Sequence, residues 1–190
     1  MRRCLVLCLS ILALFAPIPA FAAEWTGTQV MFTVEGTKPI TEAFAWSGTA
    51  CRFECPKNST AIWFAYTGPN YQATPWLWVA PQVGYAGGWV QAEDTLVGAG
   101  WGTVTLPNGI GTVDLDGEVF TTAGHNDTYW YNQYNHSWGA LNAGLHWESV
   151  NGFSQWGPQI GVKQGPWKGE VRYFTGEGAH ALRLAVKLGF

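Results

Sequence analysis

The chain ends with the stretch Ala181-Leu182-Arg183-Leu184-Ala185-Val186-Lys187-Leu188-Gly189-Phe190, in which every second residue is large and apolar. The apolar set is Leu182, Leu184, Val186, Leu188 and Phe190, and the alternate set includes Arg183 and Lys187. A period of two indicates a β-strand with one apolar face. A soluble β-sandwich would show this alternation with its apolar face toward the core, and a transmembrane β-barrel would show it with its apolar face toward lipid. Other segments must decide between these two folds.

Several upstream segments repeat this alternation; for example, Leu115 and Val119 alternate with acidic residues. The charged side chains opposite the apolar faces are five acids and five bases: Asp114, Asp116, Glu118, Glu148, Lys163, Lys168, Glu170, Arg172, Arg183 and Lys187. Apolar residues toward lipid and polar residues toward the interior are typical of a transmembrane β-barrel. Because buried charges are tolerated when paired, the balanced set predicts a small barrel with a plugged interior. In a soluble sandwich the same charges would form the wet outer face.

The final strand resembles that of outer-membrane β-barrel proteins as a class, which typically ends in Phe or Trp after apolar residues at every second position. Leu182, Leu184, Val186, Leu188 and Phe190 match this pattern position by position. The resemblance implies that the barrel-assembly machinery reads these residues as an assembly signal. It also implies contact with outer-membrane lipid and a location in the outer membrane of a Gram-negative bacterium. It covers this strand firmly and the rest of the chain only in general pattern.

The N-terminus has the pattern of a secretory signal peptide. Arg2 and Arg3 precede an apolar stretch, Cys4 to Ala16, and Ala20-Phe21-Ala22 is a small-x-small cleavage site. The alternative is a transmembrane anchor, but the apolar stretch is too short to cross roughly 30 Å of hydrocarbon. We therefore predict a signal peptide at residues 1–22 and an outer-membrane β-barrel domain at residues 23–190.

Composition supports an all-β chain and argues against a nucleic-acid partner. Removal of Arg2 and Arg3 leaves eight basic and 13 acidic residues, whereas nucleic-acid binding favours a basic patch. Only 12% of the residues are charged, and the chain has 24 Gly and 12 Trp. The stretch from Asn58 to Ala92 contains no charged residue. Its prolines and glycines break helices, so it cannot be a membrane-spanning helix.

Strand-like segments recur along the predicted barrel domain, separated by Gly, Pro and Asn. They are Trp25 to Val34, Ile40 to Thr49, Thr60 to Thr67, Trp76 to Tyr85, Thr95 to Leu106, Thr112 to Thr121, Trp138 to Ser149, Gln155 to Lys163, Trp167 to Thr175 and Ala179 to Phe190. Bacterial barrels take even strand numbers, and this length is more usual for eight strands. The sequence therefore predicts a single antiparallel transmembrane β-barrel of eight strands, with ten as the alternative.

Cys51 and Cys55 remain after the predicted cleavage, and an oxidising envelope compartment favours a disulfide between them. Residues four apart in an extended strand lie roughly 13 Å from one another, whereas a disulfide needs Cα atoms within about 7 Å. The disulfide therefore predicts a turn, and we interpret the segment as a stapled loop. A metal site is a weaker alternative because no His lies nearby.

Aromatic residues are concentrated in the segment from Tyr129 to Asn135. In a barrel, Trp and Tyr lie at the two boundaries between lipid and water, so this segment is expected as an aromatic loop or strand end at the membrane edge. The strand count leaves open that part of Tyr129 to Tyr134 is itself a strand or that two of the predicted segments merge. In a secreted lectin, the same rings would stack on sugars.

Evidence for catalysis is weak, and no metal, nucleotide or nucleophile-elbow motif is present, so no cofactor is expected. Candidate catalytic residues are His136, Ser137, His146 and Glu148, by analogy with outer-membrane enzymes that modify the acyl chains of lipid A. His136 and Ser137 are adjacent and could cooperate only in a loop, because neighbours on a strand point to opposite faces.

The leading hypothesis is a small, non-enzymatic outer-membrane barrel with a plugged interior and an envelope or surface-interaction role. The alternatives are a lipid A-modifying enzyme and a secreted β-sandwich that binds glycans. The sequence does not identify a surface ligand.

Overall fold

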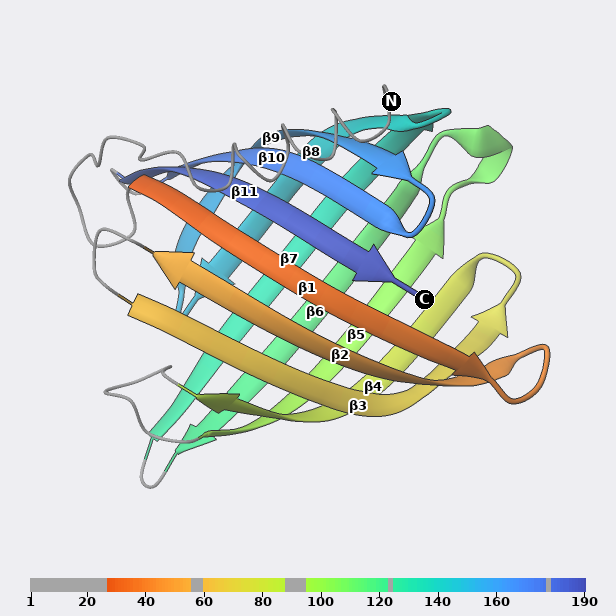
Figure 1. Cartoon of the computed structure of the whole chain (residues 1–190), viewed down its shortest axis with the longest axis horizontal. Helices are drawn as coiled ribbons and strands as arrows, with labels where there is room; N and C mark the ends of the chain where they lie inside the picture. The colour runs from red at the N-terminus through yellow and green to blue at the C-terminus, as the bar shows by residue number, and fades with distance from the viewer. Residues whose placement is uncertain (1–26, 56–59, 88–94, 123–124, 177–178) are drawn as a thin grey trace, which may run out of the picture.

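The computed structural model describes residues 27–55, 60–87, 95–122, 125–176 and 179–190. These residues form one closed barrel of eleven strands, shown in Figure 1. The strands are β1 (Gly27–Pro39), β2 (Phe44–Cys55), β3 (Thr60–Thr74), β4 (Leu77–Gly87), β5 (Thr95–Thr105), β6 (Thr112–Thr122), β7 (His125–Trp138), β8 (Leu141–Val150), β9 (Phe153–Gln164), β10 (Trp167–Gly176) and β11 (Ala179–Gly189). The predicted signal peptide lies outside the described residues.

The barrel closes through a parallel pair, which corrects the predicted even strand number. Consecutive strands are antiparallel neighbours, whereas β1 and β11 run in the same direction, with Gly27 opposite Ala181 and Glu35 opposite Gly189. Because neighbouring strands otherwise alternate in direction, an odd number brings two parallel strands together at the closure. The predictions of eight strands and of ten strands are therefore both wrong, although the closed all-β barrel is confirmed.

The additional strand is β7, with the sequence HNDTYWYNQYNHSW. Each of the ten predicted segments overlaps a strand of the barrel. β7 was not predicted as a separate strand because it has no continuous apolar face. The segment from Tyr129 to Asn135, for which the sequence allows a loop, a strand end or part of a strand, lies within β7 and is paired with both β6 and β8. Cross-strand hydrogen bonding and neighbours on both sides hold this polar segment in the sheet despite its sequence.

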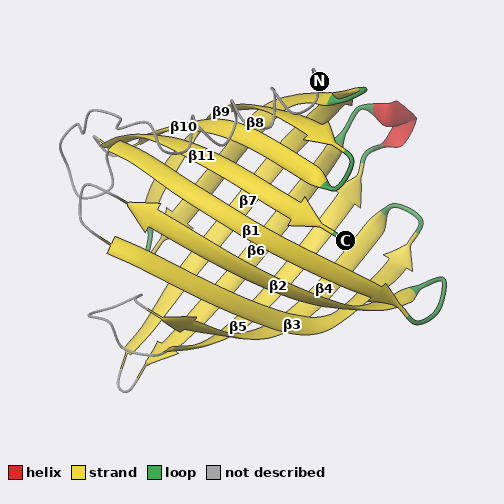
Figure 2. Cartoon of the chain, viewed as in Figure 1, coloured by secondary structure: helices red, strands yellow, loops and turns green. Residues whose placement is uncertain are grey.

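The strands are strongly tilted. A path that steps from each residue to its paired residue on the next strand, once around the barrel, returns to β1 about 14 residues from where it began. This displacement is the shear of the barrel, and for eleven strands it corresponds to a strand tilt of roughly 40° from the barrel axis. Figure 2 shows strands making up the wall, with a short 3-10 helix, Pro107–Gly109, in the connection between β5 and β6. We call the end that carries Phe190 the C-terminal end, and the end where β1 begins the opposite end.

Polarity is inverted relative to a soluble barrel. Successive side chains alternate between the two faces of the wall, and the buried inner positions include Gln29, Glu148, Arg172 and Arg183. The exposed outer positions carry large apolar side chains, among them Phe32, Val83, Leu96, Leu115, Val119, Leu145, Ile160 and Val171. Within the described strands, charged side chains on the outer face are confined to strand ends, at Lys38, Arg52 and Glu54.

Exposed aromatic side chains form two belts on the outer face. The belt near the C-terminal end contains Trp46, Tyr71, Trp138, Trp167 and Phe190, and the belt near the opposite end contains Trp63, Trp130, Trp147, Trp156 and Tyr173. From Trp130 to Trp138 the chain advances roughly 26 Å along β7. At a tilt of roughly 40° this corresponds to roughly 20 Å along the barrel axis.

The expected disulfide-stapled loop from Cys51 to Cys55 is instead part of a strand. The segment from Cys51 to Cys55 belongs to β2 and pairs residue by residue with β3, so the predicted turn is absent from it. Cys51 has a free thiol, which accepts a hydrogen bond from the Thr33 hydroxyl at 3.4 Å. The stapled loop was a wrong prediction because β-pairing holds these residues extended, at a separation that a disulfide cannot bridge.

Phe190 joins the two ends of the described sheet. Its amide donates to the carbonyl of Glu35 at 3.0 Å, and its carbonyl accepts from the amide of Thr37 at 2.9 Å. Its ring lies over Gly36, where an added Cβ would be only 3.0 Å from the nearest ring carbon. Phe190 therefore continues the β1–β11 seam, and Gly36 leaves space for its ring.

Candidate functional site: the barrel lumen

The lumen contains the charged side chains that alternation assigns to the inner face. Glu118, Glu148, Glu170, Arg172 and Arg183 are buried there, and the remaining predicted charges line inner cavities: Asp114, Asp116, Lys163, Lys168 and Lys187. They are not evenly distributed. The acids of β6 lie apart from the ion pairs contributed by β8, β10 and β11.

Arg183 and Glu148 form the most deeply buried ion pair. The guanidinium donates two hydrogen bonds to the carboxylate, at 2.9 and 3.0 Å, and a third to the Gln29 side-chain oxygen at 2.9 Å. Glu148 also accepts from Gln155 at 3.0 Å and from the Tyr129 hydroxyl at 3.3 Å. Because these residues come from five strands, the network crosses the lumen and ties its wall together.

A second network is centred on Glu170, closer to the C-terminal end. Its carboxylate pairs with Arg172 at 2.6 Å and with Lys168 at 2.7 Å. It also accepts a hydrogen bond from Gln133 at 3.2 Å, and Gln133 in turn accepts from the Tyr131 hydroxyl at 2.7 Å. The charge-assisted contacts are of the strong kind, so this network also narrows the lumen.

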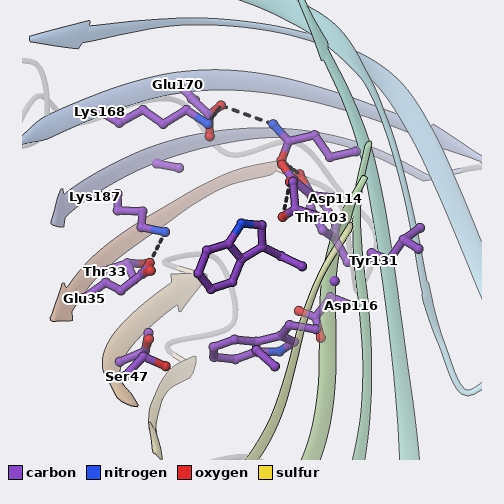
Figure 3. A pocket seen from close by; sticks show the side chains of 18 of the residues that line it. Thr33, Glu35, Ser47, Thr103, Asp114, Asp116, Tyr131, Lys168, Glu170 and Lys187 are labelled. Carbon is purple, nitrogen blue, oxygen red and sulfur yellow. Dashed lines mark hydrogen bonds and ion pairs between the residues drawn. The ribbon is translucent and has the colours of Figure 1, made fainter. Parts of the chain in front are cut away.

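A cavity of about 410 Å³ lies toward the C-terminal end, lined by charged side chains and by apolar ones such as Trp78 and Trp101, and we call it the mouth cavity. Figure 3 shows Lys168 and Lys187 on one side of it and Asp114 and Asp116 on the other. Lys187 is paired with Glu35, and Asp114 accepts a hydrogen bond from the Thr103 hydroxyl at 2.9 Å. A second cavity, of about 420 Å³, lies at the same end and is lined by Ser137, Asn142 and Lys163 among others.

A different cavity, of about 260 Å³, lies deeper, and its walls combine aromatic side chains with charged ones; we call it the inner cavity. It shares Trp101, Asp116, Tyr131 and Arg172 with the mouth cavity, so the two spaces adjoin. Part of its wall belongs to a small apolar cluster inside the barrel, made of Tyr66, Ala86, Val97, Ala99 and Phe120. The lumen thus contains a small apolar cluster beside its charged networks.

The four candidate catalytic residues do not come together. His136 contacts the Ile110 carbonyl at 2.6 Å and packs edge-on against Trp138, whereas Ser137 lines a cavity inside the barrel. His146 is only 3% exposed and packs against Phe174, with ring centroids 4.1 Å apart. The carboxylate of Glu148 forms an ion pair with Arg183. Strand alternation separates His136 from Ser137, as the sequence analysis anticipated for residues outside a loop.

Sequence reasoning missed some of the uncharged polar members of the lumen. They include Gln29 and Gln133, which are buried and hydrogen-bonded to Arg183 and Glu170, whereas the alternation in β9 already assigns Gln155 to the same face as Lys163. The signal that could have found them is the same period of two, because each is spaced by an even number of residues from an inner position on its strand. Glu35 was also missed, although it alternates with Thr33 on the inner face.

Among the residues that the structure describes, no group of three His, Cys, Asp or Glu side chains is placed to hold a metal ion. No helix in the described ranges has the length and apolar character needed to span a membrane. Comparison of the chain with protein families, curated protein sequences and solved structures gave no match.

Proposed function

We propose that this protein is an integral β-barrel of a bacterial outer membrane whose lumen is closed by its own side chains, serving an envelope or surface-interaction role. The observation that carries the proposal is the inverted polarity of the barrel. Large apolar side chains cover the outside between the strand ends, while Glu148, Arg172 and Arg183 are buried inside. Water would penalise such an exterior, whereas lipid favours it.

The aromatic belts and the strand tilt give independent support. Trp and Tyr favour the boundaries between lipid and water, and the rings of this barrel gather near both ends of the strands. A tilt of roughly 40° lies within the range of transmembrane barrels, and a spacing of roughly 20 Å between the belts approaches the height of their apolar band. The partners that follow are outer-membrane lipid and, during biogenesis, the barrel-assembly machinery.

The alternatives receive less support. A glycan-binding β-sandwich is contradicted, because the strands close into one barrel rather than two packed sheets. A lipid A-modifying enzyme based on His136, Ser137, His146 and Glu148 lacks an assembled site, since His136 and Ser137 lie on opposite faces of β7.

Cell fractionation followed by gel electrophoresis tests the membrane assignment. The protein is expected in the outer-membrane fraction, and the unboiled sample should migrate differently from the boiled one, because a closed hydrogen-bonded barrel resists unfolding in detergent. Recovery from the soluble periplasmic or culture fraction would overturn the proposal.

Phe190 is expected to support assembly of the barrel in the membrane. Deleting it removes two seam hydrogen bonds and the ring over Gly36, and it also removes the terminal residue of the proposed assembly signal. We expect the membrane-inserted yield to fall several-fold, measured as the heat-modifiable fraction. Phe190→Trp, which keeps a large ring and the backbone contacts, is the matched control. An unchanged yield after deletion would contradict this role.

The closed lumen predicts no stable channel. Purified protein in a planar bilayer should show no steady conductance, because the Arg183–Glu148 and Arg172–Glu170 networks cross the interior and narrow it. Eight strands give an interior just wide enough for side chains, so in this eleven-strand barrel the closure depends on the two networks and not on the barrel width. Steady single-channel steps from the intact protein would show that the lumen is open.

A further inference from the structure

We propose that the inner cavity binds a small organic cation, an amine or quaternary ammonium with an apolar body. The proposal goes beyond the membrane assignment, because it concerns the interior of the folded barrel whatever surrounds it. It depends on three features of the cavity: its aromatic walls, two carboxylates without a cationic partner, and its volume.

The walls present several aromatic rings to one space. Phe64, Tyr66, Trp101 and Phe120 all line the cavity, and each ring contacts at least one of the others. The centroids of Phe64 and Phe120 are 5.9 Å apart, and those of Tyr66 and Trp101 are 5.1 Å apart, both in edge-to-face arrangements. Ring faces carry partial negative charge, so a space enclosed by several rings attracts a cation more than an anion.

Charge pairing leaves two acids of β6 uncompensated. Each cation that lines the inner cavity is paired with a carboxylate: Arg183 with Glu148, Lys187 with Glu35, and Arg172 with Glu170, which also pairs with Lys168. Asp116 and Glu118 also line the cavity, and neither forms an ion pair with any residue that the structure describes.

The contacts of these two acids are consistent with a missing positive charge. Glu118 is buried and accepts a hydrogen bond from the Tyr66 hydroxyl at 2.9 Å. One oxygen of Asp116, Oδ1, is buried without a hydrogen-bond partner. A buried carboxylate is costly unless a charge or hydrogen bonds compensate it, and a bound cation would supply that compensation.

The volume favours a compact ligand with an apolar part. An engineered apolar cavity of about 150 Å³ is enough to hold benzene, and the inner cavity measures about 260 Å³. A single aromatic ring with a short cationic group therefore fits. The shared lining residues Trp101 and Asp116 place the mouth cavity next to this site, which provides a path from the C-terminal end.

Calorimetry on the folded full chain in detergent tests the proposal with three probes of similar size: benzyltrimethylammonium, benzyl alcohol and benzoate. We expect the cation to bind at least about tenfold more tightly than the neutral and anionic probes. The double variant Asp116→Asn with Glu118→Gln should lose that preference while retaining binding of benzyl alcohol. Asp114→Asn is the matched control, because Asp114 lies on the same face of β6 but lines the mouth cavity. No preference for the cation, or no binding of any probe, would overturn the proposal.

The free thiol of Cys51 offers a second measurement, because it lines the inner cavity. In exported protein carrying Cys55→Ser, the Cys51 thiolate attacks a methanethiosulfonate reagent, forming a mixed disulfide and releasing methanesulfinate. A trimethylammonium reagent should react at least about tenfold faster than its sulfonate counterpart, after correction for their intrinsic rates. The Asp116→Asn, Glu118→Gln variant should reduce this ratio. Equal rates, faster reaction of the anion or no reaction would contradict a cation-selective cavity.

The two proposals fail in different measurements. The heat-dependent gel shift of the same sample shows whether the barrel is folded, and cell fractionation shows whether it is in the outer membrane. The ratio of reaction rates in the folded barrel tests the cation site alone.

Discussion

Replacing Glu148 with alanine is expected to lower the free energy of unfolding by about 3–5 kcal/mol, because it leaves a buried charge without its partner. Arg183 is only 5% exposed, and Glu148 accepts two of its hydrogen bonds. The substitution also removes the acceptor for Gln155 and Tyr129. Urea unfolding of the barrel in lipid vesicles, followed by tryptophan fluorescence, measures the change.

Two further variants separate loss of the ion pair from general damage. Glu148→Leu combined with Arg183→Met should recover much of the lost stability, because replacing both charges removes the unpaired group. Glu54→Ala breaks the Arg52–Glu54 pair, whose side chains are 62% and 43% exposed, and should cost less than about 1 kcal/mol. A Glu148→Ala variant as stable as the Glu54→Ala variant would contradict a structural role for the buried network.

Ile160→Arg is expected to cost about 2–4 kcal/mol of stability in lipid, the penalty of a cation facing the middle of a bilayer. Ile160 is 59% exposed on the outer face of β9, four residues from the strand end at Gln164. The same urea titration in vesicles measures the effect.

Gln164→Arg is the matched control, since it places the same side chain on the same face near the lipid boundary. We expect it to cost no more than about 1 kcal/mol, because the penalty falls toward the interface. If both substitutions were equally well tolerated, the outer face would be in contact with water and the membrane assignment would fail.

Much of the strand pattern could be predicted from local sequence. The alternation from Leu182 to Phe190 marked a strand, and the same period assigned Asp114, Glu148 and Arg183 to one face. This works because successive side chains of a strand point to opposite sides, whatever the rest of the fold does. The interior cavities could not be predicted, because their walls combine residues from distant strands, such as Tyr66 on β3 and Glu118 on β6.

Local pattern failed where neighbouring strands decide the conformation. β7 has polar residues on both faces, so its extended form depends on pairing with β6 and β8. Cys51 and Cys55 suggested a turn, but pairing between β2 and β3 holds the segment extended. Both errors treated a segment in isolation when its hydrogen-bond partners determine its shape.

By itself, the sequence determined an all-β chain with alternating polar and apolar faces, because side-chain direction along a strand is a local property. Only the tertiary structure decided that eleven strands close through a parallel β1–β11 pair, and which charges meet across the lumen. It also decided that Asp116 and Glu118 remain without an ion-pair partner among the described residues while Arg183 and Glu148 are matched. Register and closure bring residues far apart in the chain into contact, and no local pattern specifies those distances.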